Sequence, residues 1–422
     1  MDKMIKKVLD LQKTDYQIDS RLVKKGTIFF ALKGERTDGH LYLREVTKKG
    51  AKLAIVDKNV KVDLQGIDLE ILRVEDVLEF LQALAREELK KSPAKIIGIT
   101  GSSGKTTTKE FIYTLLKSEF RVSKTLKSYN SKAGLPIAIL NMDKNVDFLV
   151  LEMAMDEIGE IEKLVKKIAR PDIALITQIA TFAGDVGSQE VLAEAKKEIF
   201  IDEKTKVKLI NKRLEKLKAF QGENYLTYSI EDKKADFYLD VENLCFYEKG
   251  KKCSIEKLPF KESHLLENLL AAISICRLAG EKFKNILKKL QTLKAYDMRF
   301  EKVLIENILF IKDYYNGNPD ATFAALKNLP QTKGKKIAVL GSHRSYGKLS
   351  SRVHEKIINE ARKYVDEILC IGEEFKNIKN IKNYSSLEDI AKNLKKIIKK
   401  DDVVLIKGSR FLKMEKIFEF LN

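Results

Sequence analysis

Residues 101–107 carry the strongest chemical signal in this chain. They read Gly-Ser-Ser-Gly-Lys-Thr-Thr and lie between an apolar strand-like segment, 95–100, and an amphipathic helix-like segment. A glycine turn at the start of a helix leaves backbone N–H groups facing an anion, and the helix dipole attracts that anion. Lys105 would reach the terminal phosphates, and the Thr106 hydroxyl would bind Mg²⁺. We predict a phosphate-binding loop formed by Gly101, Ser102, Ser103, Gly104, Lys105, Thr106 and Thr107.

This loop is a compact variant of the general pattern. Position 99 is isoleucine where G-x-x-x-x-G-K-[ST] has its first glycine. A chance glycine-lysine-threonine turn is the alternative, but the strand and the helix stand on the correct sides. The loop does not name a reaction, because phosphate loops serve motors, switches, kinases and ligases alike.

Glu152 is the candidate metal partner of the loop. It follows the apolar run 148–151. A carboxylate at the carboxyl end of a parallel strand can point into a ligand crevice and hold Mg²⁺. The alternative is a solvated glutamate at a strand end. The charge directly after nearly unbroken apolar residues favours the metal role.

The elements that would position these residues alternate along the chain. Strand-like pieces and glycine turns precede a helical run at 74–90, and Ser92-Pro93 breaks that helix. From Lys95 to about Leu290 apolar strands alternate with helices, which indicates a mostly parallel sheet. After Leu293 the alternation restarts in four strand–helix units. We predict an α/β protein with a small α/β domain (1–92), a central phosphate-loop domain (93–292) and a C-terminal Rossmann-like domain (293–422).

Composition limits the class of protein. The chain has 422 residues, with 44% hydrophobic and 33% charged residues, which is typical of soluble globular proteins. No apolar run approaches the roughly 20 residues that span a bilayer, and no export signal core follows the N-terminus. We therefore expect a cytoplasmic protein. The scattered cysteines, without metal-ligand spacing, are expected to be reduced: Cys245, Cys253, Cys276 and Cys370.

The net charge of +18 raises the question of an acidic partner. Clustered lysine and arginine would indicate nucleic acid. The excess is mostly lysine spread along helix-like segments such as 391–400, which is typical of solvated faces. We expect no nucleic-acid partner, and a P-loop ATPase acting on nucleic acid is kept as the alternative from another class.

Several motifs, in this order, resemble the Mur ligases. They are the N-terminal segment 19–43, the loop variant 101–110, and the segments 128–140, 151–161, 313–326 and 403–410. The resemblance runs nearly end to end and implies an ATP- and Mg²⁺-dependent amide ligase of cell-wall synthesis. The element Tyr315-Asn316-Gly317-Asn318-Pro319 and the run Lys407-Gly408-Ser409-Arg410 resemble the members that add D-alanyl-D-alanine to UDP-N-acetylmuramoyl-tripeptide. The resemblance implies an acyl-phosphate intermediate and no side-chain nucleophile.

The resemblance also assigns residues of the central and C-terminal domains. Lys196 matches a lysine that becomes carbamylated and then lies beside Mg²⁺, so the implied catalytic set is Lys105, Lys196 and Glu152, and the implied metal set is Thr106, Glu152 and carbamylated Lys196. His264 and Asn268 lie four apart on a helix, and the asparagine is expected near adenine. Arg299, Asp313 and Asn316 match positions on the ATP side that complete the site when the third domain closes.

Substrate contacts are implied at two further places. Ser20 and Arg21 match a pair near the uridine diphosphate, with Thr37-Asp38-Gly39-His40 as a second matching segment. Asn130 and Ser131 match a loop that contacts substrate, although an Asn-Ser turn is also ordinary loop chemistry. A monomer is expected.

Two segments depart from the family pattern. Members usually carry a histidine that helps to hold a second Mg²⁺ after the strand at 171–177, and this chain reads QIATFAGDVGSQ there. Either Asp185 substitutes, or the second metal site is altered. The segment GSHRSYGKL also differs from the usual glycine-aspartate-methionine run. The alternatives left open are a ligase that adds a single amino acid, a folylpolyglutamate-type ligase, a ligase with an altered amine substrate, and a non-catalytic nucleotide-binding scaffold.

The phosphate loop generates the first prediction. Lys105→Ala should abolish nucleotide-driven turnover, because it removes the cation that reaches the terminal phosphates. Phosphate release by the variant and the wild-type chain provides the measurement. Near-normal turnover in the variant would remove the loop from the mechanism.

Overall fold

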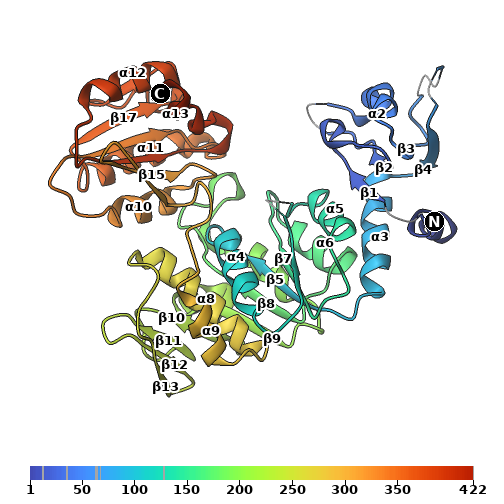
Figure 1. The fold of residues 1–422 in the computed structure, drawn as a ribbon, viewed down its shortest axis with the longest axis horizontal. Helices are drawn as coiled ribbons and strands as arrows, with labels where there is room; N and C mark the ends of the chain where they lie inside the picture. Colours follow the sequence, from blue (N-terminus) through green and yellow to red (C-terminus); the bar gives the residue numbers. More distant parts are fainter. Residues whose placement is uncertain (12–13, 35–36, 62–64, 67, 127–128, 422) are drawn as a thin grey trace.

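A computed structural model describes residues 1–11, 14–34, 37–61, 65–66, 68–126 and 129–421. Glu35 and Arg36 of the N-terminal motif, and Ser128 of the segment 128–140, lie outside the described residues. The described chain builds three sheets in sequence order, each covered by helices (Figure 1). The first and third units lie on opposite sides of the central one (Figure 1).

The first unit is a four-stranded parallel sheet in the order β1-β2-β3-β4. Its elements are α1 (Asp2–Leu9), β1 (Asp15–Gln17), β2 (Thr27–Phe30), α2 (Leu43–Lys48), β3 (Leu53–Asp57), β4 (Glu70–Val74) and α3 (Val77–Lys90). The β2 strand is buried along its whole length, so it forms the centre of this unit. Asn141 of the central unit exchanges two hydrogen bonds with the backbone of Tyr16, at 2.9 and 2.8 Å, which ties the first sheet to the second.

The central unit has nine strands in the order β13-β12-β11-β10-β9-β8-β5-β7-β6. The strands are β5 (Lys95–Thr100), β6 (Val122–Lys124), β7 (Phe148–Glu152), β8 (Ile173–Ile176), β9 (Val207–Asn211), β10 (Leu226–Ser229), β11 (Phe237–Asp240), β12 (Cys245–Glu248) and β13 (Lys251–Ser254). Pairing is parallel from β6 to β11, and the last two strands, β12 and β13, add to β11 in antiparallel fashion. The expected mostly parallel sheet is confirmed.

Helices cover both faces of this sheet because βαβ crossovers place them there. On one face the apolar cluster draws on α4 (Lys105–Leu116), α8 (Ser263–Leu278) and α9 (Phe283–Leu290). On the other it draws on α5 (Gly134–Asn141), α6 (Glu160–Lys167) and α7 (Gln189–Lys197), and it continues into the first unit. The phosphate loop joins β5, a central strand, to α4. The loop is therefore anchored to a strand that is buried from Ile96 to Thr100.

The third unit is a six-stranded sheet in the order β14-β15-β19-β16-β17-β18. Its elements are β14 (Glu301–Ile305), β15 (Ile308–Asp313), α10 (Pro319–Lys327), β16 (Lys336–Gly341), α11 (Ser350–Ala361), β17 (Glu367–Ile371), β18 (Lys382–Tyr384), α12 (Leu387–Ile397), β19 (Val403–Lys407) and α13 (Ile417–Leu421). The four predicted strands are β15, β16, β17 and β19. The sequence prediction lacked β14, an exposed antiparallel edge whose apolar run is only three residues long, and β18, which has three residues and no apolar run.

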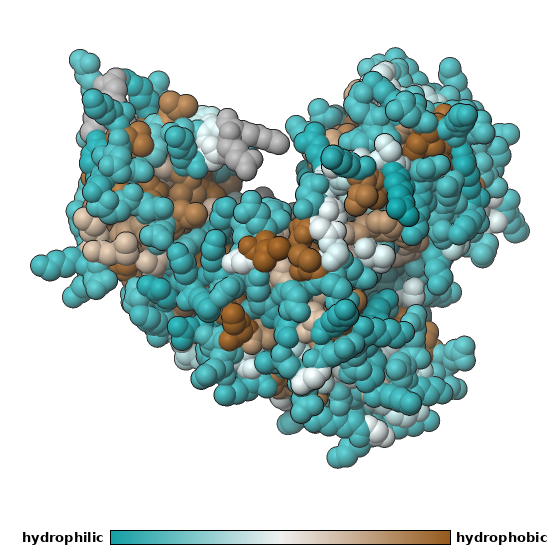
Figure 2. Space-filling model, turned by 180° about the vertical axis from the view of Figure 1, so that it is seen from behind, coloured by the Kyte–Doolittle hydropathy of each residue, from teal (hydrophilic) through white to brown (hydrophobic). Residues whose placement is uncertain are grey.

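Within the described residues, no helix combines the length and the apolar character needed to cross a bilayer. The molecule seen from behind has a largely hydrophilic surface, with a hollow open between the first and third units (Figure 2).

Two buried histidines of the third unit give a prediction for stability. Burial lowers the pKa of His343 to about 3 and also lowers that of His354, whose Nε2 accepts the His343 backbone N–H at 3.0 Å. The unfolded chain binds protons on these rings below about pH 6.5, whereas the folded chain resists protonation. The contribution of these two rings to the free energy of unfolding is therefore fully present above that pH and is lost as the pH falls.

As the pH falls from 6.5 to 5, His343 alone should lower the free energy of unfolding by about 2 kcal/mol. Urea unfolding of the wild-type chain and of His343→Gln across this range provides the measurement. The glutamine variant should show a shallower pH dependence, and identical slopes in the two proteins would contradict the assignment.

Candidate functional site

The phosphate loop requires glycine at two positions because of its neighbours. Gly101 has φ +146°, and a Cβ there would stand 2.0 Å from Thr177 Oγ1. Gly104 has φ +83°, and a Cβ there would stand 2.3 Å from Asn268 Oδ1. Residues with side chains are strained at such positive φ values. The two glycines therefore allow the loop to turn tightly while the helices and strands around it pack closely.

The loop is held from its outer side by the segment that follows β8. Thr177 Oγ1 donates a 2.6 Å hydrogen bond to the Ser103 carbonyl, and Ser103 Oγ donates one of the same length to Gln178. The Lys105 ammonium donates to the Gly101 carbonyl at 2.7 Å. Burial lowers the pKa of Lys105, and Glu152 opposes that shift. The loop is thus preorganised, with its lysine folded back over it.

Glu152 and Thr106 form the metal candidate. Glu152 is 2% exposed, and its Oε2 accepts a 2.7 Å hydrogen bond from the Thr106 hydroxyl. Its Oε1 accepts the Asn130 amide at 2.8 Å. Lys109, fully buried one turn along α4, lies 3.7 Å from Oε2. The carboxylate is therefore held by polar groups on both oxygens.

This donor set fits Mg²⁺. A hydroxyl and one carboxylate are the hard oxygen ligands that Mg²⁺ takes alongside phosphate oxygens and water. The described residues contain no cluster of three or more His, Cys, Asp or Glu side chains that could hold a metal. Thr106 and Glu152 would hold the ion, and the nucleotide would supply the other ligands.

Lys196 lines the same cavity from α7. It is 4% exposed, and burial, assisted by the positive charge of Lys105, lowers its pKa to about 7. A lysine in water is almost fully protonated at neutral pH. Here a substantial fraction is the neutral amine, which is the nucleophilic form.

His264 and Asn268 extend the cavity along α8. The His264 ring meets the edge of Phe300 at 4.8 Å between centroids, and burial lowers the pKa of His264 to about 4. Its buried Nδ1 has no hydrogen-bond partner in the structure. A neutral ring with an open nitrogen, beside an asparagine amide, suits a planar heterocycle that carries donors and acceptors.

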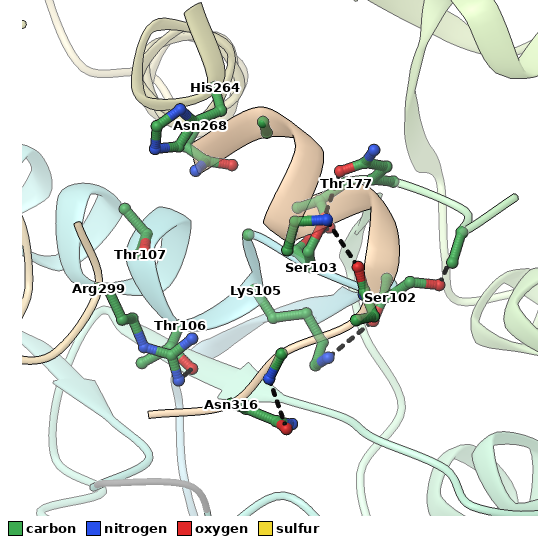
Figure 3. Close-up of a pocket in the computed structure, with 18 of the residues that line it drawn as sticks. Ser102, Ser103, Lys105, Thr106, Thr107, Thr177, His264, Asn268, Arg299 and Asn316 are labelled. Carbon is green, nitrogen blue, oxygen red and sulfur yellow. Dashed lines mark hydrogen bonds between the residues drawn. The ribbon is translucent and has the colours of Figure 1, made fainter. Parts of the chain in front are cut away.

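The third unit supplies the opposite wall. Arg299 donates to Thr106 Oγ1 at 2.9 Å and stacks over the Tyr315 ring at 4.3 Å. Asp313 accepts the Lys407 ammonium at 2.8 Å. The resulting cavity has a volume of about 590 Å³ and is lined from both units. Figure 3 shows the phosphate-loop side chains, His264, Asn268, Arg299 and Asn316 around it.

The structure brings most of the predicted residues into this one cavity. They are Gly101, Ser102, Ser103, Gly104, Lys105, Thr106, Thr107, Asn130, Glu152, Lys196, His264, Asn268, Arg299, Asp313 and Asn316. Ser131 does not line it, because its Oγ accepts the Gly134 N–H at the start of α5 at 3.2 Å. Ser20 and Arg21 lie in the first unit, outside the cavity.

The N-terminal candidates differ in their surroundings. Ser20 is buried and contacts Glu45, whereas the Arg21 side chain is 84% exposed and pairs with Asp19. His40, the histidine of the second matching segment, is buried. Its ring contacts Asp38 and accepts the Asp57 N–H at 3.0 Å. His40 is therefore a structural residue of the first unit.

Asp185 is the residue that the sequence offers in place of the missing histidine. It lies outside the cavity, and its backbone N–H donates to the Ser345 carbonyl of the third unit at 2.8 Å. The neighbouring Phe182 packs against the third unit's apolar cluster, and the Thr181 N–H donates to Asp320 at 2.6 Å. The two segments that depart from the family pattern therefore contact each other.

Two buried lysines near the site were not among the predicted site residues, although Lys407 belongs to a matching run. Lys109 and Lys407 are each buried, and each contacts a predicted carboxylate. The spacing of Lys109 three residues after Thr106 on one helix was an available signal for the first. Lys407 meets Asp313 because of the register between β15 and β19, and residue spacing along the chain does not give that register.

Three family models match the chain in order. They are "Mur ligase family, catalytic domain" at residues 14–88, "Mur ligase middle domain" at 99–276 and "Mur ligase, glutamate ligase domain" at 298–410. The fold and the interdomain site define the class, and the chain belongs to the Mur ligase family.

Individual relatives carry a more specific name. The UDP-N-acetylmuramoyl-tripeptide--D-alanyl-D-alanine ligase of Bacillus subtilis is 31% identical, covering 96% of this chain and 92% of the relative. The crystal structure of the MurF ligase from Thermotoga maritima in complex with ADP has a TM-score of 0.81 and 31% identity, covering 98% of each chain. A MurF structure from Acinetobacter baumannii has a TM-score of 0.81 and 25% identity, covering 97% of this chain and 93% of that one.

The carboxylate at the metal candidate gives a further prediction. Glu152→Gln removes one charge with little change of shape, so activity should fall by about 10² to 10³-fold and more Mg²⁺ should be required. Glu157→Gln, on the exposed surface, serves as the matched control. A Mg²⁺ titration of ATP turnover provides the measurement. An unchanged Mg²⁺ requirement in Glu152→Gln would contradict the metal role.

Proposed function

We propose that this Mur ligase joins D-alanyl-D-alanine to UDP-N-acetylmuramoyl-tripeptide with ATP and Mg²⁺, in the synthesis of a peptidoglycan precursor. The observation that carries the proposal is the cavity in which Arg299, Asp313 and Asn316 of the third unit face the phosphate loop of the central unit. The names of the relatives that align over nearly the whole chain support the substrates.

The chemistry follows from the charges around the cavity. The terminal carboxylate of the tripeptide attacks the γ-phosphorus of ATP, the bond to the β-γ bridging oxygen breaks, and ADP leaves. The D-alanyl-D-alanine amine then attacks the acyl carbon, loses a proton, and expels phosphate. Phosphoryl transfer depends mainly on positioning and on neutralising charge. Lys105 and Arg299 supply fixed positive charge, and Mg²⁺ held by Thr106 and Glu152 would neutralise more.

We propose that the adenine lies along α8, against His264 and Asn268. The open Nδ1 of the neutral imidazole and the asparagine amide offer hydrogen bonds in a water-poor place. The triphosphate would then run along the loop towards Lys105. This orientation directs the γ-phosphate towards the wall where Arg299 meets Thr106.

We propose that Lys196 reacts with CO₂. The neutral amine attacks the carbon of CO₂, a proton leaves, and a carbamate anion forms. Burial keeps the amine partly neutral, and the nearby Lys105 charge stabilises the anion. The product is an oxygen donor on α7, on the same cavity wall as the phosphate loop.

The uridine diphosphate is proposed to bind the first unit. The hollow between the first and third units gives a long substrate room to reach the cavity (Figure 2). The exposed guanidinium of Arg21 is suited to a diphosphate, and Ser20 lies next to it in η1 (Ser20–Leu22). We propose that the enzyme works in the cytoplasm, since ATP and UDP-linked precursors are cytoplasmic compounds, and we propose a monomer.

One assay tests the function as a whole. Phosphate release is measured with UDP-N-acetylmuramoyl-tripeptide and ATP, with and without D-alanyl-D-alanine. Single amino acids and the UDP-linked dipeptide replace the substrates in parallel reactions, and DNA alone is a further arm. Release that needs both the tripeptide and the dipeptide supports the proposal. Release driven by DNA or by a single amino acid, or none at all, would overturn it.

The carbamate gives a separate prediction. Lys196→Ala should lower the turnover number by at least about 10²-fold, because it removes an anionic group at the transferring phosphate. Wild-type enzyme in CO₂-depleted buffer should lose activity and regain it when bicarbonate is added. ¹³C-bicarbonate should give a carbamate NMR signal that is absent from Lys196→Ala. Full activity without CO₂ would contradict the carbamate.

A further inference from the structure

We propose that Arg410 binds the free carboxylate of the incoming dipeptide and so selects an amine substrate that carries a carboxylate. The inference rests on the proposed function and adds a residue that determines specificity. Arg410 begins the short helix η9 (Arg410–Leu412), which follows the carboxyl end of β19. It lines the ATP cavity beside Asn316 and Asn318 of the third unit.

The other cations of the cavity have neighbours that assign them elsewhere. Lys105 belongs to the phosphate loop, and Arg299 contacts the metal-candidate hydroxyl of Thr106. Lys407 is buried and bound to Asp313. Lys196 is buried and sits on α7 of the central unit. Arg410 lines the cavity from η9 of the third unit, and its side chain is also half exposed to solvent.

The present partner of Arg410 is easily exchanged. Arg410 Nη1 lies 2.7 Å from Glu415 Oε1, and the two side chains are 49% and 31% exposed. Ion pairs in such exposed positions contribute little to stability. The planar guanidinium has further N–H groups that can bind a carboxylate through two parallel hydrogen bonds. Turning from Glu415 to a substrate carboxylate therefore costs the fold little.

The reaction requires a cation close to the carboxylate of the incoming dipeptide. The dipeptide has to present an uncharged amine to the acyl carbon while its other end carries a full negative charge. Moving that carboxylate from water into a cavity is costly unless a cation meets it. Because Arg410 belongs to the third unit, its contact with the dipeptide would also favour the closed arrangement over the phosphate loop.

A second cavity of the third unit offers the competing location. It also has a volume of about 590 Å³ and lies along the carboxyl ends of β16, β17 and β18. Its arginine, Arg344, stacks over Phe411 at 3.5 Å from the ring centroid. Arg344 does not line the ATP cavity, so a carboxylate bound there would not deliver its amine to the acyl phosphate.

The test compares D-alanyl-D-alanine with D-alanyl-D-alaninamide, which keeps the amine and lacks the charge. Wild-type enzyme should prefer the acid by about 10 to 100-fold in kcat/KM. Arg410→Ala should remove this preference by raising KM for the acid, with KM for ATP and for the UDP-linked tripeptide unchanged. Arg410→Lys should retain part of the preference. Lys416→Ala, an exposed residue nearby, should behave as wild type.

The outcomes separate the role of Arg410 from the proposed function of the enzyme. Equal losses with acid and amide in Arg410→Ala, or an unchanged preference, would overturn the role of Arg410. Loss of the preference in Arg344→Ala instead would place the carboxylate in the second cavity and would also overturn it. A wild-type enzyme that uses neither dipeptide would refute the proposed function itself.

Discussion

The site depends on the hydroxyl of Thr106. It donates to Glu152 at 2.7 Å and accepts from Arg299 at 2.9 Å, so one oxygen joins the phosphate-loop helix, the end of β7 and the third unit. The hydroxyl can take this place only because Gly104 turns the chain with φ +83° directly before α4 begins. A Mg²⁺ ion held by Thr106 and Glu152 would therefore lie where the third unit contacts the central one.

Three buried lysines lie at or near the site, and their charges have different neighbours: Lys109, Lys196 and Lys407. Lys109 balances Glu152, and Lys407 balances Asp313. Isolated charges in a protein interior are costly, and pairing offsets that cost. Burial, with the positive Lys105 nearby, lowers the pKa of Lys196 to about 7. The same residue type therefore carries a paired charge in two places, and in the third we propose that it reacts with CO₂.

The arrangement of the third unit is supported outside the cavity as well. Phe182 packs against the apolar cluster of the third unit, with the Lys356 ammonium 4.7 Å from its ring centroid. The backbone N–H groups of Asp185 and Thr181 donate hydrogen bonds to Ser345 and Asp320 of the third unit. The Ser263 N–H donates to Asn328 at 2.9 Å on the other side. These contacts bring Arg299, Asp313 and Asn316 to the phosphate loop, which the central unit could not complete alone.

The sequence by itself determined the phosphate loop, the α/β class and the apolar strands, because glycine spacing, strand runs and helix periodicity act over a few residues. It also placed Glu152 at a strand end. Long-range packing controls four further features, which only the folded chain shows. They are the burial of His40, the contact of Asp185 with Ser345, the pairing of Lys407 with Asp313 and the place of Arg410 in the cavity. These depend on strand register and on contacts between units, which local spacing does not encode.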